Sequence, residues 1–122
     1  MKIWLAVFLG GGAGSLLRFA ISRAFLLLHG KTVFPWATLA SNVLASALLA
    51  WLVLRVQVDQ PGREHWQALL AVGFCGGFST LSTFSYENHQ LLRDGMMGMA
   101  LLNIAVSVAL GILVFHLFTR SA

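Results

Sequence analysis

The feature that most constrains this chain is a series of four apolar segments, each long enough to cross a lipid bilayer. A membrane-spanning helix needs about 20 mostly apolar residues. The segments run from Ile3 to Leu28, Ala37 to Val56, Trp66 to about Leu92 and Met96 to Phe118. Only 10% of the 122 residues are charged, whereas a soluble domain carries about 25%. We therefore predict a single all-α transmembrane domain over residues 1–122.

The third segment differs from the others near its middle. Gly73, Gly76 and Gly77 are followed there by a run of serine and threonine residues. A broken helix at membrane depth is tolerated only where it is buried in protein or lines an aqueous cavity. We therefore predict that the third helix is broken near its middle and that the break marks a functional site.

Basic residues in the connections and near the span ends, leaving out Arg18, predict how the chain inserts. With four spans both termini lie on one side, and an excess of Lys and Arg normally makes one side cytoplasmic. The two sides carry four and three such residues: Lys2, Arg55, Arg63 and Arg120 against Arg23, Lys31 and Arg93. Because this bias is nearly zero, we expect dual topology and an antiparallel homodimer.

Charge and cysteine content exclude several classes of function. The net charge is +4, but the basic residues are scattered singly between apolar runs, so we expect no nucleic-acid partner. Cys75 is the only cysteine, and the four histidines show no metal-ligand spacing. We therefore expect neither a disulfide framework nor an enzyme with a metal centre.

Polar and small residues recur inside three spans at four-residue intervals, which places each set on one helix face. The sets are Gly10, Gly14, Arg18 and Ser22; Thr38, Asn42 and Ser46; and Asn103, Ser107 and Gly111. Such a stripe is either a helix–helix interface, since small residues let backbones approach, or the wall of a pore.

Two charged residues within the spans bear on the solute. A cation such as Arg18 in an apolar span costs about 3 kcal/mol or more, so we favour a functional role for it over snorkelling to the interface. Glu87 is either functional or an interfacial residue on a helix emerging into water. One firm cation together with amide and hydroxyl donors favours a small anion as the solute.

Three sequence motifs resemble those of a known family, the dual-topology Fluc or CrcB-type fluoride channels. The third-span sequence Gly73-Phe-Cys-Gly-Gly-Phe-Ser-Thr-Leu-Ser-Thr-Phe-Ser85 resembles the central motif of that family. The pattern from Gly10 to Arg18 and the pair Thr38 and Asn42 match its other signatures in order and spacing. The resemblance implies a passive fluoride channel in the inner (plasma) membrane, with two pores per antiparallel homodimer, that exports cytoplasmic fluoride.

The resemblance also implies roles for individual residues. Asn42 would donate an N–H to the dehydrated ion, Phe84 would offer a ring edge, and Arg18 would lie in an electropositive vestibule. The carbonyls of Gly76 and Ser79 would hold a central structural sodium ion. The full set of pore residues implied in this way is Asn42, Phe84, Leu81, Ser107, Thr83 and Thr38.

Leu81 departs from the family pattern, because a second phenylalanine is usual at its position. Either one phenylalanine suffices, or the chain pairs with a homologue in a heterodimer that has fewer working pores. A non-conducting partner subunit is therefore one alternative function. A small multidrug-type cation exporter is another, but it would need a carboxylate in the first helix, where this chain has Arg18.

Overall fold

The computed structural model describes residues 2–120, in which every regular element is a helix and no strand occurs. The first span is α1 (Lys2–His29), and the second is α2 (Trp36–Trp51), which continues into the π-helical η1 (Leu52–Val56). The third comprises four pieces: α3 (Glu64–Trp66), the π-helical η2 (Gln67–Cys75), α4 (Gly76–Phe78) and α5 (Leu81–Arg93). The fourth is α6 (Met97–Arg120).

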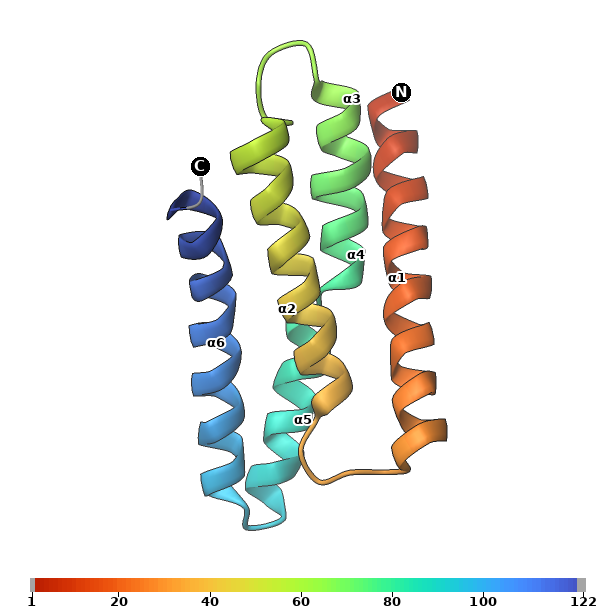
Figure 1. The fold of residues 1–122 in the computed structure, drawn as a ribbon. Helices are drawn as coiled ribbons and strands as arrows, with labels where there is room; N and C mark the ends of the chain where they lie inside the picture. The colour runs from red at the N-terminus through yellow and green to blue at the C-terminus, as the bar shows by residue number, and fades with distance from the viewer. Residues whose placement is uncertain (1, 121–122) are drawn as a thin grey trace.

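These helices form four segments long and apolar enough to cross a membrane (Figure 1). Their bounds are Lys2–His29, Trp36–Val56, Glu64–Arg93 and Met97–Arg120. The four-span prediction is confirmed, with ends that differ from the expected ones by no more than two residues. The chain is therefore a multi-pass membrane protein.

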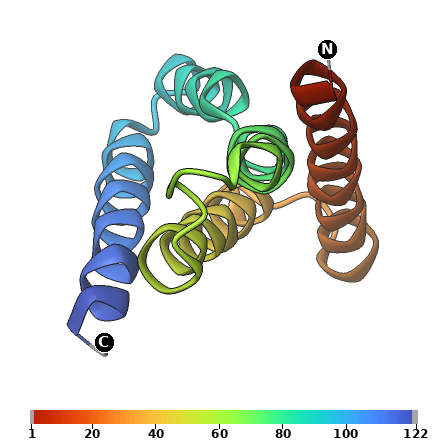
Figure 2. The same ribbon diagram turned by 90° about the horizontal axis from the view of Figure 1, so that it is seen from above.

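The third span is the centre of the arrangement. Its first half, residues 64–78, packs along α1, whereas α5 and α2 pack against α6 (Figure 2). Both described ends of the chain and the connection 57–63 lie at one end of the molecule, as Figure 1 shows, and the other two connections lie at the opposite end. The break between the two halves of the third span thus lies within the helical bundle.

Large apolar side chains point away from the protein. Trp4, Phe8 and Leu28 on α1 are 81%, 75% and 77% exposed, and only 6% of the most apolar stretch of α6 is buried. A patch of this extent requires lipid or another protein chain as its neighbour. The packing within the protomer is therefore confined to the faces that meet the third span and α2.

Candidate functional site

The third span is broken at Ser79 and Thr80. Both residues have extended backbones, with φ −85° and ψ 157° at Ser79 and φ −153° and ψ 117° at Thr80. They separate α4 from α5, so the prediction of a broken helix is confirmed. The break lies near the middle of the span Glu64–Arg93, as predicted. The glycines at 73, 76 and 77 precede it and are themselves helical.

Gly73 and Gly77 pack the third span against α1. A Cβ atom on Gly77 would collide with the carbonyl oxygen of Gly11, and one on Gly14 would collide with the carbonyl oxygen of Phe74. A Cβ on Gly73 would lie 2.9 Å from the Val7 carbonyl oxygen. The α1 stripe is therefore a helix–helix interface, in which two backbones touch without intervening side chains.

Asn42 of α2 binds the break directly. Its Oδ1 accepts a hydrogen bond from the Thr80 backbone N–H at 2.9 Å. In an unbroken helix this N–H would bond to the carbonyl oxygen of Gly76, four residues earlier. Because Oδ1 is engaged, the donor side of the Asn42 amide is the part left for a solute.

Thr80 also begins the second half of the span. Its Oγ1 accepts a hydrogen bond from the Thr83 backbone N–H at 3.2 Å, and the two hydroxyl oxygens lie 3.2 Å apart. This is an N-cap, which satisfies one of the unpaired N–H groups at the start of α5. The helix start, with its partial positive charge, therefore lies at the break. Sequence reasoning did not single out Thr80, although a threonine before a helical segment is a common capping signal.

The carbonyl of Gly76 is a candidate cation ligand. The Thr80 N–H that would bond to it in a helix is diverted to Asn42, and a Cβ on Gly76 would meet nothing within 4 Å. Gly76 and Ser79 both line a cavity of about 160 Å³ together with Ala45 and Ser46. Backbone carbonyls are hard oxygen ligands, which is the ligand type needed by the sodium ion that the family resemblance implies.

A buried pair of amides joins α5 to α6. Asn103 Nδ2 donates to Asn88 Oδ1 at 2.8 Å, and the two residues are 1% and 6% exposed. Ser107 Oγ donates to Asn103 Oδ1 at 3.3 Å. Sequence reasoning missed Asn88, whose amide within a membrane span was the available signal.

The stripes of α2 and α6 face each other. A Cβ on Gly111 would lie 3.6 Å from Ser46 Oγ, and α2 and α6 pack side by side. The α2 stripe therefore meets both the break, through Asn42, and the fourth helix. Thr38, at one end of this stripe, is buried and lies beside Glu87.

Glu87 lines a larger cavity of about 540 Å³ near the connection between α1 and α2. Ser22, Lys31 and Asp94 line the same cavity. Glu87 Oε1 is buried and has no hydrogen-bond partner within residues 2–120. The carboxylate is thus placed between a polar cavity and the buried Thr38.

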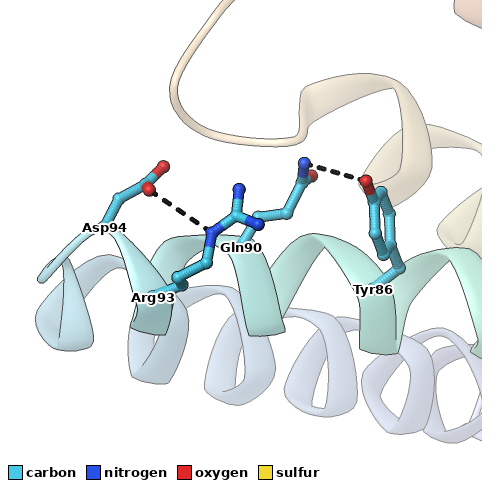
Figure 3. A network of polar contacts seen from close by, with 4 residues as sticks. All are labelled: Tyr86, Gln90, Arg93 and Asp94. Atoms are coloured by element: carbon cyan, nitrogen blue, oxygen red, sulfur yellow. Dashed lines mark hydrogen bonds and ion pairs between the residues drawn. The ribbon is translucent and has the colours of Figure 1, made fainter.

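Polar contacts on α5 lie beside this cavity, at the same end of the molecule (Figure 3). Gln90 Nε2 donates to Tyr86 OH at 3.2 Å, and Arg93 Nε lies 3.8 Å from Asp94 Oδ1. Exposed contacts of this kind contribute little to stability. They mark where the third span meets water.

The predicted pore residues fall into separate groups in the protomer. Asn42 and Thr83 lie at the break, linked through Thr80. Thr38 lies beside Glu87, and Ser107 is hydrogen-bonded to Asn103. On α5, Phe84 is partly buried and Leu81 is 76% exposed. Leu81 therefore presents its side chain to the surroundings of the protomer.

Arg18 does not extend away from the protein toward the interface. Its side chain is partly buried, and its Nε donates to the Gly77 carbonyl oxygen at 3.2 Å. This contact joins α1 to the end of α4 and excludes the snorkelling orientation, and the functional role of Arg18 stays a prediction.

Comparison with known proteins places the chain in a family. Residues 5–118 match the model described as CrcB-like protein, Camphor Resistance (CrcB). A protein named fluoride-specific ion channel FluC, from Escherichia coli O17:K52:H18 (strain UMN026 / ExPEC), is 40% identical over 129 aligned positions, which cover 99% of this chain and 97% of that protein. The protein of the same name from Escherichia coli O139:H28 (strain E24377A / ETEC) matches with the same identity and coverage. The chain therefore belongs to the CrcB-like family of FluC fluoride channels.

Proposed function

We propose that the chain is the subunit of a passive, fluoride-selective channel that exports fluoride across the inner (plasma) membrane. The relatives named as fluoride-specific ion channels support this function. The intramembrane inventory of one cation with amide and hydroxyl donors agrees with an anionic solute, and the family assignment favours a channel over a multidrug-type exporter. A negative cell interior drives an anion outward by about 2.3 kcal/mol per 100 mV, so no coupled ion is required.

The observation that carries the proposal is the orientation of the Asn42 amide. Fluoride is strongly hydrated, so a narrow pore must replace the lost water with hydrogen-bond donors. Thr80 N–H occupies Asn42 Oδ1 at 2.9 Å, which directs the Nδ2 donors elsewhere. In a low-dielectric surrounding such donors bind an anion strongly. Asn42 thus stabilises the break with one end of its amide and fluoride with the other.

The proposed assembly is an antiparallel homodimer with two pores. The near-equal numbers of basic residues on the two sides support insertion in both orientations, and the exposed apolar surface supports a protein partner. The Gly76 and Ser79 carbonyls of both subunits would hold a sodium ion at the dimer centre. When bound, the cation would supply a fixed positive charge and join the two broken helices.

The test of this function is fluoride efflux from liposomes containing purified wild-type protein or Asn42→Asp. A carboxylate at position 42 still accepts from Thr80 N–H but has no donor when ionised, so the break is preserved and fluoride loses its ligand. We expect flux to fall by at least about 100-fold, because a donor to a charged group is worth about 1.5–3 kcal/mol and the added negative charge repels the ion.

Gln60→Glu is the matched control, since it adds the same charge in the exposed connection 57–63. It should conduct like the wild type. Chloride and a cationic dye are assayed in parallel as other solutes. Wild-type protein that moves the dye and not fluoride would refute the channel function, and Asn42→Asp that conducts normally would refute the assignment of Asn42.

A further inference from the structure

Arg18 binds the third span where its first half ends. Its Nε–H donates to the Gly77 carbonyl oxygen at 3.2 Å, across 59 positions of sequence. In an unbroken helix this carbonyl would accept from the N–H of Leu81. Leu81 instead begins α5, beyond the extended residues 79 and 80. Arg18 therefore supplies a donor that the broken helix has lost.

The close glycine contacts of α1 explain why the Arg18 side chain lies beside the end of α4. Gly14 lies so close to the third span that a Cβ would be 2.8 Å from the Phe78 backbone nitrogen. Arg18 follows four residues later on the same face of α1. Its stem therefore starts beside the last residues of α4, and its cation meets the end of a helix that carries partial negative charge.

Two of the backbone groups that lose their helical partners at the break are thus satisfied from two different helices. Asn42 of α2 takes the Thr80 N–H, and Arg18 of α1 takes the Gly77 carbonyl. Buried backbone groups require such partners. The two contacts lie three residues apart along the span and flank Ser79.

We propose that Arg18 is a positioning residue whose hydrogen bond to the Gly77 carbonyl holds the geometry of the break, and that fluoride flux depends on this bond more than on the positive charge. This differs from the vestibule role that the family resemblance implies, in which the charge itself attracts the anion. The inference rests on the proposed function for its flux measurement alone; its structural measurement is independent of what the protein transports.

Three substitutions separate the bond from the charge. Arg18→Gln keeps an N–H donor on the atom attached to Cδ, where the arginine has Nε, and removes the charge. Arg18→Lys keeps the charge but moves the donor one atom further along the chain. Arg18→Met has a similar reach with neither donor nor charge. Each variant is first tested for a single monodisperse species in detergent.

The first measurement is backbone hydrogen–deuterium exchange over residues 76–84, with α6 of the same sample as the internal reference. Arg18→Gln should exchange within about threefold of the wild type, whereas Arg18→Met and Arg18→Lys should exchange at least about tenfold faster there and normally in α6. The second is fluoride efflux from liposomes, in which the same order is expected: Arg18→Gln active, the other two at least about tenfold slower.

The opposite pattern would overturn the proposal. If the Arg18→Lys variant conducts fluoride and Arg18→Gln is as slow as Arg18→Met, the positive charge matters and the hydrogen bond does not. Unchanged exchange over residues 76–84 in Arg18→Met would overturn it as well. If Arg18→Met does not fold, the comparison of Arg18→Gln with Arg18→Lys still decides. Wild-type protein without fluoride flux would count against the proposed function. The exchange data alone would then decide whether Arg18 holds the geometry of the break.

Discussion

At the scale of single residues, the close contact between Gly77 and Gly11 leaves no room for a methyl group. Gly77→Ala would place its Cβ against the Gly11 carbonyl oxygen, and neither backbone has space to retreat. We expect a loss of about 2 kcal/mol or more in the free energy of unfolding. Thermal or SDS-induced unfolding of the purified protein measures this.

Gly12→Ala is the control for that substitution, since a Cβ there meets nothing within 4 Å. It should leave stability unchanged or raise it slightly, because alanine favours helix. Equal stability of the Gly77→Ala and Gly12→Ala variants would contradict the packing of α1 on α4.

The side chains at 81 and 84 test whether ring edges bind the ion. Phe84→Ile should lower fluoride flux from liposomes by about tenfold, because the ring edge is the positive part of the aromatic quadrupole. Leu81→Phe should leave flux intact or raise it, and since Leu81 is 76% exposed the larger ring disturbs no packing inside the protomer.

Phe8→Ile is the control for Phe84→Ile, because Phe8 is a 75% exposed ring on α1. Normal flux from Phe84→Ile would mean that the pore does not use the Phe84 ring. If wild-type protein conducts only when mixed with a homologue, Leu81 marks the non-conducting partner subunit of a heterodimer.

At the scale of elements, the Asn88–Asn103 hydrogen bond fixes α5 against α6. Asn103→Leu leaves a buried amide on α5 without its partner, so we expect this single change to cost about 1–2 kcal/mol of stability. Adding Asn88→Leu should recover part of the loss, because no unpaired amide is then left. Unfolding measurements on both single variants and the double variant give the coupling.

Ser107→Ala serves as the comparison in that series, since it removes only the hydroxyl that donates to Asn103 Oδ1 at 3.3 Å. Its effect on stability should be smaller than that of Asn103→Leu. Strictly additive effects of the two leucine substitutions would mean that the amide pair does not join the helices energetically.

The helices were largely predictable from sequence, but the hydrogen-bond partners of their polar residues were not. Span ends follow from runs of apolar residues, which are local. The glycines indicated a break, but the break lies two to three residues later, where Asn42 provides an acceptor for Thr80 N–H. That contact spans 38 positions and that of Arg18 spans 59. A pattern along one helix shows that a polar residue needs a partner without showing which partner it has.

For the helical stripes too, the sequence predicted which residues share a face but not what that face contacts. Spacing correctly placed Gly10 and Gly14 on one face with Arg18, and the interface interpretation of the glycines is confirmed. The spacing did not show which element the α1 stripe contacts, and the structure shows that it contacts backbone atoms of the third span. Asn103 of the α6 stripe is hydrogen-bonded to Asn88 of α5. Sequence patterns could not identify Asn88, because α5 carries many polar residues and only the packing of α5 on α6 shows which of them contacts Asn103.

At the scale of the whole molecule, both described ends of the chain lie at one end of the bundle (Figure 1). Reporter fusions at the carboxyl terminus should therefore be found on both sides of the membrane, given the four-to-three distribution of basic residues. Asp59→Lys with Gln60→Lys should fix the termini in the cytoplasm, because Lys-rich connections stay inside.

The mirrored control places the two lysines at the other end, at Val33 and Met97, which are 58% and 62% exposed. It should fix the opposite orientation, with the carboxyl terminus outside. A wild-type population inserted in only one orientation would contradict the proposed dual topology and, with it, the antiparallel homodimer.

The outward-facing apolar surface has a consequence for how much of the protein a cell must make. With only 6% of the most apolar stretch of α6 buried, a lone protomer gains little from its own interior, and the proposed dimer contributes much of what keeps it ordered. In the bilayer, dimerisation then depends on the number of chains per membrane area, so that a lower density favours the separate chains. Halving gene expression would lower the active fraction as well as the total amount, so that export capacity should fall more steeply than copy number.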